Sequence, residues 1–250
     1  MRKQLWAWSV AVLAALARAQ SPTDGFSLNA VNFYVQKPYD LQLSDRYQFQ
    51  DGVHTLWTRS DDKAFQQGNT TDGRTEMRWD NFNDQGVDHM FDADVMVEAG
   101  SNQTCIMQVK SNTSGEAVYM QVFSPGEVRW GSQSGSVMIA NAYGTWFNLK
   151  AAYNPKTRQA RVWINNVLKR TATHGQAAQD WYFKNGTYGT SGVSKAHFRN
   201  IKLWTTGKPS GIAPRFARAS ILPALRIDAR GRLLPAAALR NIAAFPLPKP

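Results

Sequence analysis

The sequence predicts an all-β fold, a jelly-roll sandwich of two curved antiparallel sheets, over residues 20–208. Short apolar or alternating runs recur through this region, and glycine, asparagine and proline separate them. None of these runs has the long 3.6-residue apolar stripe with caps that would indicate a helix. Closely spaced short strands with turn residues between them are typical of antiparallel sandwiches and barrels.

The expected strands lie in HTLWTRS, RTEMRW, DHMFDADVMVEAG, TCIMQVKS, AVYMQVFSPG, EVRWGS, WFNLKAAYNP, ARVWINN, DWYFKNGTYG and AHFRNIKLWTTG. The chain's one cysteine, Cys105, excludes an internal disulfide. We expect it to be a buried, inert thiol that faces the core together with Met107 and Val109. A secreted fold without a disulfide needs a large core, which 250 residues can supply.

Both ends of the chain differ in composition from this β region. Residues 1–19 combine a basic start, a short apolar run and the small-residue pattern ARA, which predicts a signal peptide and a secreted, extracellular protein with no membrane span after cleavage. Residues 209–250 are rich in proline, alanine and arginine and are expected to be disordered. Four N-x-S/T sequons fit a secreted glycoprotein; they begin at Asn69, Asn102, Asn112 and Asn185.

The formal net charge of +11 belongs mostly to these two ends. Three of the positive charges fall within residues 1–19 and a net six within residues 210–250, which leaves +2 for the region between. A nucleic-acid-binding domain would carry its basic residues on the folded part. The charge distribution therefore argues against a nucleic-acid partner.

Three of the predicted strands carry polar side chains on one face, because alternate residues of a strand point to the same side. These residues are Arg74, Glu76 and Arg78 on the first, Gln108 and Lys110 on the second, and Tyr182, Lys184 and Tyr188 on the third. If the three strands are neighbours, the cations, amide and phenols form a cleft suited to an anionic ligand that bears carboxylates. An ordinary solvated sheet face remains the alternative.

The motifs RTEMR, QVK and YFKNGTY resemble those of the alginate lyase superfamily of polysaccharide lyases, which has a concanavalin A-like jelly-roll fold. In the N-terminal half, PTDGF, NFYVQKPYD, RYQFQDGVHTLW and CIMQV resemble the plant citrate-binding protein family more closely still. Fungal glucuronan lyases share the fold. The resemblance extends from about Pro22 to Trp204.

The resemblance implies a role for each matching residue. Arg74 and Gln108 would hold and neutralise a uronate carboxylate, and Tyr188 would be the catalytic tyrosine. A tyrosine can serve as the base if neighbouring cations depress its pKa. The residues implied to line the cleft and bind substrate are Arg78, Glu76, Lys184 and Tyr182. The chain departs from the lyases at two points: Lys110 stands where they carry a histidine, and Gly189 and Thr190 replace the Asn-Gln that follows the tyrosine.

We expect Lys110, or His54 if it faces the cleft, to assist Tyr188 in proton transfer. The favoured interpretation of His54 is a structural histidine shared with the citrate-binding relatives. The predicted function is a secreted, monomeric protein that binds a uronate-containing polysaccharide of the glucuronan or alginate type. Cleavage of that polysaccharide by β-elimination is left open, because Lys110 stands in place of the lyase histidine. The alternative is a non-catalytic carboxylate- or glycan-binding protein like the citrate-binding proteins, and a purely structural wall protein comes third. A glycoside hydrolase ranks low, because Asp92 and Asp94 share a strand face without a matching acid signature.

No cofactor is expected. His89, His174 and His197 show no metal-ligand spacing, and no acidic cluster resembles a calcium loop, although a structural calcium on scattered ligands stays open. Among the tryptophans, Trp57, Trp79 and Trp130 are better explained as core residues than as platforms for sugar rings.

Overall fold

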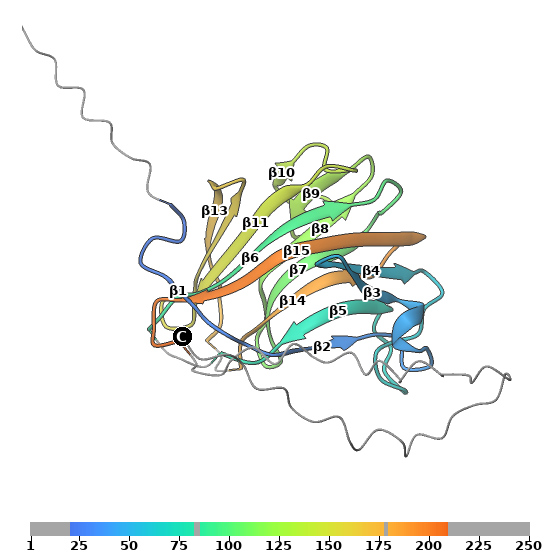
Figure 1. Cartoon of the computed structure of the whole chain (residues 1–250), viewed down its shortest axis with the longest axis horizontal. Helices are drawn as coiled ribbons and strands as arrows, with labels where there is room; N and C mark the ends of the chain where they lie inside the picture. The colour runs from blue at the N-terminus through green and yellow to red at the C-terminus, as the bar shows by residue number, and fades with distance from the viewer. Residues whose placement is uncertain (1–20, 83–85, 178–179, 210–250) are drawn as a thin grey trace, which may run out of the picture. The chain divides into compact units, whose positions relative to one another are not determined.

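The computed structural model describes residues 21–82, 86–177 and 180–209, which form a sandwich of two antiparallel sheets (Figure 1). The predicted all-β jelly-roll class is confirmed. The predicted signal peptide at residues 1–19 and all but the first residue of the basic tail, which begins at residue 209, lie outside the described residues. Within the described part of the chain, no helix is long and apolar enough to cross a membrane.

Sheet A consists, in spatial order, of β13 (Val167–Thr173), β12 (Gln159–Ile164), β11 (Phe147–Asn154), β6 (His89–Val97), β15 (Val193–Thr205), β4 (Val53–Arg59) and β3 (Tyr47–Gln50), with β1 (Ser27–Leu28) also paired to β15. Sheet B consists of β10 (Val137–Ile139), β9 (Glu127–Trp130), β8 (Gly115–Phe123), β7 (Thr104–Ser111), β14 (Tyr182–Tyr188), β5 (Arg74–Trp79) and β2 (Phe33–Gln36). One short 3-10 helix, η1 (Leu43–Asp45), precedes β3.

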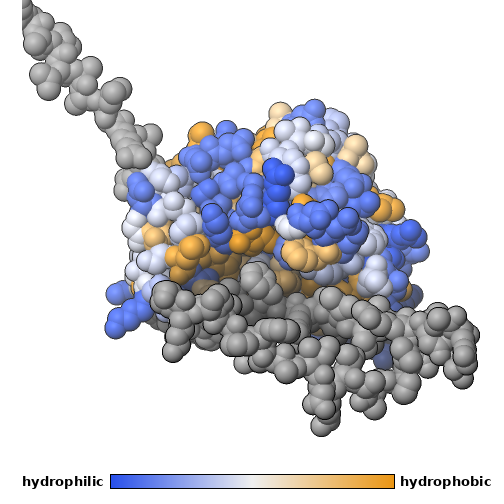
Figure 2. Space-filling view, viewed as in Figure 1, coloured by the Kyte–Doolittle hydropathy of each residue, from blue (hydrophilic) through white to orange (hydrophobic). Residues whose placement is uncertain are grey.

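The core lies between the two sheets, because each strand sends alternate side chains inward. Leu56 of β4, Met77 of β5, Phe91 of β6 and Phe198 of β15 have no exposed surface. Figure 2 shows mostly hydrophilic residues on the upper part of the visible face, with hydrophobic residues gathered in a band below them.

Strand β14 lies between β7 and β5 and aligns the three polar segments. Lys184 is opposite Arg78 on β5 and opposite Gln108 on β7, and Tyr188 is opposite Arg74 on β5. Because residues opposite each other on neighbouring strands share a face, this register brings the three sets of polar side chains together. The expectation that these strands are neighbours is confirmed.

Several edge strands were not predicted from the sequence. Strand β13 reads VLKRTAT and is largely exposed, so it lacks the apolar alternation of a half-buried strand. It pairs with β12 through a two-residue turn at Asn165 and Asn166, with φ of 50° and 64°. Asparagine tolerates this left-handed region, which a tight hairpin turn requires at both positions.

A β-bulge at Ile106 changes the face to which Cys105 belongs. The pairing of β7 with β8 shifts register between Cys105 and Met107, and Ile106 takes the core position. Cys105 is instead opposite Tyr188 on β14, on the polar side of sheet B. The expectation of a buried thiol is confirmed, but the prediction that it faces the core beside Met107 is wrong, because the bulge adds one residue to the alternation.

Candidate functional site

The outer face of sheet B, on the side away from sheet A, gathers the polar residues that the sequence singled out. We call it the polar face. It contains Tyr34 and Gln36 of β2, Arg74, Glu76 and Arg78 of β5, Tyr182, Lys184 and Tyr188 of β14, Cys105, Gln108 and Lys110 of β7, and Tyr119 of β8.

Glu76 is the centre of this face. Its side chain is 1% exposed, and Gln108 Nε2 donates a hydrogen bond to Glu76 Oε1 at 2.5 Å. Lys184 forms an ion pair with the other carboxylate oxygen, and Arg74 Nη1 lies 3.6 Å from the same oxygen. A buried carboxylate needs such partners, because an unpaired charge is costly away from water. Glu76 therefore fixes an amide and two cations in one arrangement.

Lys184 is equally buried, at 2% side-chain exposure. Burial lowers its pKa, and the neighbouring Arg74 cation acts in the same direction, while the Glu76 carboxylate opposes both. The Glu76–Lys184 pair belongs to the frame of the site, because neither group has appreciable surface with which to meet a ligand.

Two arginines on β5 each stack on a tyrosine of β14. The Arg74 guanidinium lies 4.1 Å from the Tyr188 ring centroid, and the Arg78 guanidinium lies 3.9 Å from that of Tyr182. Stacking on an aromatic ring orients a guanidinium while leaving its N–H edges available. Arg78 has no carboxylate partner among the described residues; its guanidinium donates to the Trp79 carbonyl oxygen at 2.6 Å and to the Asn81 side chain.

The polar face carries a positive charge. Its three central cations are Arg74, Arg78 and Lys184, and its central carboxylate is Glu76, which leaves a formal net charge of +2. Lys110 does not add to this excess, because its Nζ forms an ion pair with Glu116 at 2.5 Å. An anionic group is the ligand that such an excess favours.

Tyr188 is half-buried beside Arg74, and its hydroxyl has no hydrogen-bond partner among the described residues. Burial raises the pKa of this phenol; the Arg74 cation opposes the shift without reversing it. The condition under which Tyr188 could serve as a base, a pKa depressed by neighbouring cations, is therefore not met. Tyr188 is a neutral phenol at neutral pH, able to donate a hydrogen bond or a proton.

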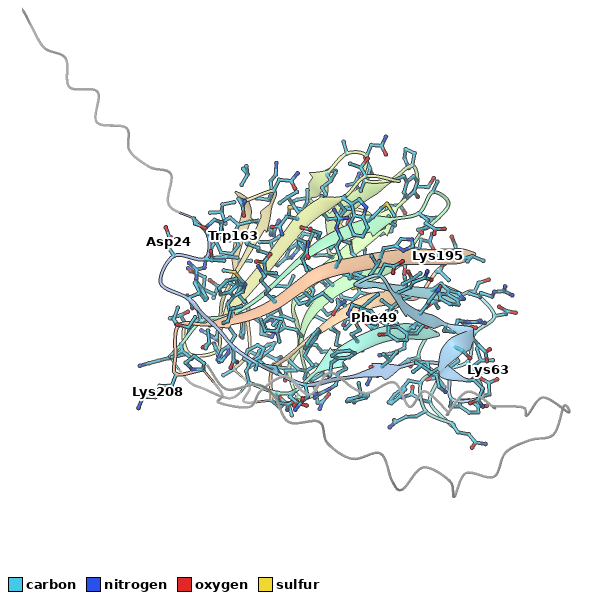
Figure 3. All side chains as sticks on the ribbon, viewed as in Figure 1. Asp24, Phe49, Lys63, Trp163, Lys195 and Lys208 are labelled. Carbon is cyan, nitrogen blue, oxygen red and sulfur yellow. The ribbon has the colours of Figure 1, made fainter. Side chains whose placement is uncertain are left out.

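His54 does not lie on the polar face. It shares a face of β4 with Leu56, which points into the core, and its ring makes an edge contact with Phe33 of sheet B at 5.8 Å. Phe49, labelled in Figure 3, stacks on it at 4.4 Å, and the Tyr47 hydroxyl is 2.8 Å from Nδ1. Burial lowers its pKa to about 4. The hypothesis that His54 faces the cleft is wrong, because the alternation of β4 turns it inward.

Three residues of the polar face were missed in the sequence analysis. Tyr34 and Gln36 lie on β2, opposite Arg78 and Glu76 respectively, and Tyr119 on β8 is opposite Gln108. Gln36 Nε2 donates to the Tyr34 hydroxyl at 3.3 Å. The alternating pattern of AVYMQVF contains the signal for Tyr119, whereas FYVQ is too short to stand out as a strand.

Other residues considered from the sequence have structural partners. Asp92 of β6 lies on the outer face of sheet A, where Lys150 is 3.1 Å away and Trp204 Nε1 donates to it at 3.2 Å. Trp79 is buried and donates its Nε1 hydrogen to Asn185 at 2.8 Å. Across residues 21–82, 86–177 and 180–209, no group of three or more His, Cys, Asp or Glu side chains is arranged to hold a metal ion.

Solved structures of alginate lyases share this fold. Alginate lyase AlgAT5 of polysaccharide lyase family 7 matches with a TM-score of 0.55 at 13% identity, over 75% of this chain and 99% of that one. The family 7 enzyme A1-II′ in complex with its product matches with a TM-score of 0.54 at 16% identity, over 74% and 99% of the two chains. The marine family 7 lyase AlyA1 from Zobellia galactanivorans matches with a TM-score of 0.53 at 13% identity, over 74% and 99%. These likenesses establish the fold.

The fold and the polar face together define the class as a jelly-roll protein, folded like the alginate lyases, with a cationic sheet face. Within that class, the citrate-binding protein of Hevea brasiliensis is 30% identical over 191 residues, which are 73% of this chain and 79% of that protein. The chain belongs to the citrate-binding protein family, as its N-terminal motifs indicated. No family model matches the sequence.

Proposed function

We propose that the polar face binds the carboxylate groups of a uronate-containing polysaccharide or of a small carboxylic acid. One observation carries the proposal: Glu76 holds Gln108, Lys184 and Arg74 in place, while the positive charge of the face exceeds what Glu76 neutralises. A carboxylate placed over Arg74 meets preorganised donors and loses little in ordering them.

The free polar atoms around Arg74 support this position for the carboxylate. The Arg74 side chain keeps 12% of its surface exposed, and the hydroxyl of the half-buried Tyr188 has no hydrogen-bond partner among the described residues. Guanidinium and phenol groups both donate hydrogen bonds to carboxylate oxygens. The names of the relatives, a citrate-binding protein and alginate lyases, agree with an anionic ligand.

The arrangement of the proton-transfer groups favours binding over turnover. Tyr188 is neutral, Lys110 is paired with Glu116, and His54 lies between the sheets. A general base must lie within reach of the proton that it removes and be unprotonated. β-Elimination is the second candidate function, favoured by the one feature that Tyr188 is stacked on Arg74 with a free hydroxyl; the tyrosine would then carry out both proton transfers.

The N-terminal pattern of residues 1–19 supports the further proposal that the mature protein is secreted, as a monomer, and meets its ligand outside the cell. Citrate, glucuronan, alginate, pectate and glucuronoxylan supply the candidate ligands for the assay. They should be compared by the rise in melting temperature that each causes, since a ligand that binds only the native state stabilises it.

Arg74→Ala should abolish the thermal shift, whereas Arg199→Ala, on the outer face of sheet A, should retain it. The ultraviolet absorbance of the unsaturated product, recorded on the same polymers with Tyr188→Phe as control, tests the second candidate. A rise that Tyr188→Phe abolishes would replace binding by catalysis as the function. An absent thermal shift with every ligand would refute carboxylate binding at this face.

A further inference from the structure

The four predicted sequons occupy very different environments. Asn185 is fully buried and accepts the Trp79 hydrogen bond, so a glycan on it is incompatible with the fold. Asn102 Nδ2, the atom to which a glycan would be attached, donates a hydrogen bond to Ser191 Oγ at 2.9 Å. Only Asn69 and Asn112, both exposed, have a side-chain nitrogen that donates no hydrogen bond within the described part of the chain.

Asn112 lies beside the polar face. It directly follows β7, two residues beyond Lys110, and its Oδ1 accepts a hydrogen bond from the Tyr182 hydroxyl at 2.7 Å. The same Tyr182 ring carries the stacked Arg78 guanidinium. The hydrogen bond fixes Oδ1 toward the tyrosine, and the two substituents of a planar amide point apart. Nδ2 is therefore directed away from Tyr182 and remains free for a substituent.

N-glycosylation leaves this arrangement intact. The Asn112 amide nitrogen forms a bond to the anomeric carbon of a sugar supplied by a lipid diphosphate-linked oligosaccharide. The diphosphate departs with the electron pair of the broken bond, and the nitrogen loses one proton. The carbonyl oxygen takes no part in the new bond, so its hydrogen bond from Tyr182 is retained.

We propose that Asn112 carries an N-linked glycan and that this glycan limits the length of ligand that can lie on the polar face. The inference rests on the proposed carboxylate binding and on passage of the chain through a secretory pathway. Arg74 and Arg78 are four residues apart on β5, which places them about 13 Å apart along the strand at 3.3 Å per residue.

That spacing separates two classes of ligand. A small acid such as citrate fits at Arg74 without reaching the edge where Asn112 lies. A uronate chain that also contacts Arg78 must pass over Tyr182, beside the glycan attachment point. The glycan therefore acts as a size filter, weakening the binding of long chains and leaving that of small carboxylates unchanged.

The sequon can be removed without touching Asn112. Ser114 completes it, and Ser114 Oγ is buried with no hydrogen-bond partner among the described residues, so Ser114→Ala removes the glycan acceptor at little structural cost. Ser114→Thr keeps the sequon and is the matched control. Asn69→Gln removes the other exposed sequon, which lies in the connection between β4 and β5 and not on a strand of the polar face, and tests for effects of carbohydrate elsewhere on the chain.

The full chain should be secreted from insect cells, and its glycans located by peptide mass spectrometry. We expect Asn112 to be occupied, and Ser114→Ala to bind long oligoglucuronates about tenfold more tightly, about 1.4 kcal/mol, with the affinity for citrate unchanged. Ser114→Thr and Asn69→Gln should match the wild type.

An unmodified Asn112 in the secreted protein would overturn the proposal. So would an occupied Asn112 whose removal leaves the affinity for long chains unchanged. If neither citrate nor oligoglucuronate binds any variant, the proposed carboxylate binding fails, and the size filter fails with it. The mass spectrum still reports the modification, so the two failures are distinguishable.

Discussion

Replacing Glu76 by glutamine isolates the charge of the buried network while keeping its shape. In Glu76→Gln the substituted amide would still offer one oxygen to Gln108, but Lys184 would lose its carboxylate partner while remaining 2% exposed. Removing one partner of a buried ion pair typically costs 3–5 kcal/mol, since the other charge is left uncompensated. We expect Glu76→Gln to lower the free energy of unfolding by about 4 kcal/mol.

Urea unfolding and thermal melting measure this loss. For a domain of this size, 1 kcal/mol corresponds to a shift of about 2–4 °C, so the melting temperature should fall by roughly 12 °C. The double variant Glu76→Gln with Lys184→Met should recover most of the loss, because replacing both members of the ion pair leaves no uncompensated buried charge. A double-mutant cycle therefore gives a large coupling energy.

The pH dependence supplies a second test of the same variant. Burial already lowers the pKa of Lys184, and without Glu76 it falls further. Between that pKa and about 10.4, the unfolded chain binds one more proton than the native state, so the stability of Glu76→Gln should rise with pH. The account of Glu76 as a buried counter-charge would be refuted if Glu76→Gln lowered the free energy of unfolding by less than about 1 kcal/mol. It would also be refuted if the effects of Glu76→Gln and Lys184→Met were strictly additive in the double variant.

Arg74→Ala and Arg78→Ala should each weaken carboxylate binding about tenfold to hundredfold, and Arg199→Ala is the control that should leave it unchanged. Calorimetric titration with oligouronate measures these affinities. Equal losses of affinity in all three variants would refute a site on the polar face. His54 has a pKa lowered to about 4, so the unfolded state binds more protons between pH 4 and 6.5, and stability should fall by up to about 3 kcal/mol as pH drops through this window. His54→Gln should flatten that slope in urea titrations; an unchanged slope would assign it to other groups. Gly186→Ala should lower the free energy of unfolding by at least about 2 kcal/mol, because the φ of Gly186 is 150° and an added Cβ would lie 2.2 Å from a backbone oxygen of β5. Thermal melting measures this loss. A melting temperature equal to that of the wild type would contradict the strain.

The sequence predicted the fold class and the grouping of the three motif strands, because both follow from two-residue alternation and turn residues. It failed where the alternation is broken or too short. Because of the bulge at Ile106, Cys105 lies on the polar face. Strand β2 has only four residues, too few to be recognised from the sequence, so Tyr34 and Gln36 were not predicted. For His54 the sequence left a cleft role and a structural role open, because a histidine on a half-buried strand gives no local signal of the face it occupies.

The sequence also could not predict that Lys110 pairs with Glu116, or that the donors converge on Glu76. Both depend on which strands are neighbours and on register, and those are set by packing across the whole sheet. Burial then determines the direction of the Tyr188 pKa, and that burial comes from residues distant in sequence.

Strand β14 is polar on both of its faces. On the polar face it carries Lys184, while on the core side Asn185 accepts from Trp79 and Thr187 bonds to Thr58 across the sandwich at 2.8 Å. A slip of one residue would exchange these sets and leave every partner unmatched. Strand β14, which carries Tyr188 beside Arg74, therefore also fixes the register of sheet B. Variation in ligand preference among relatives should accumulate on β2 and β8, which do not pair with β14, so that a side chain there can change without disturbing its alignment.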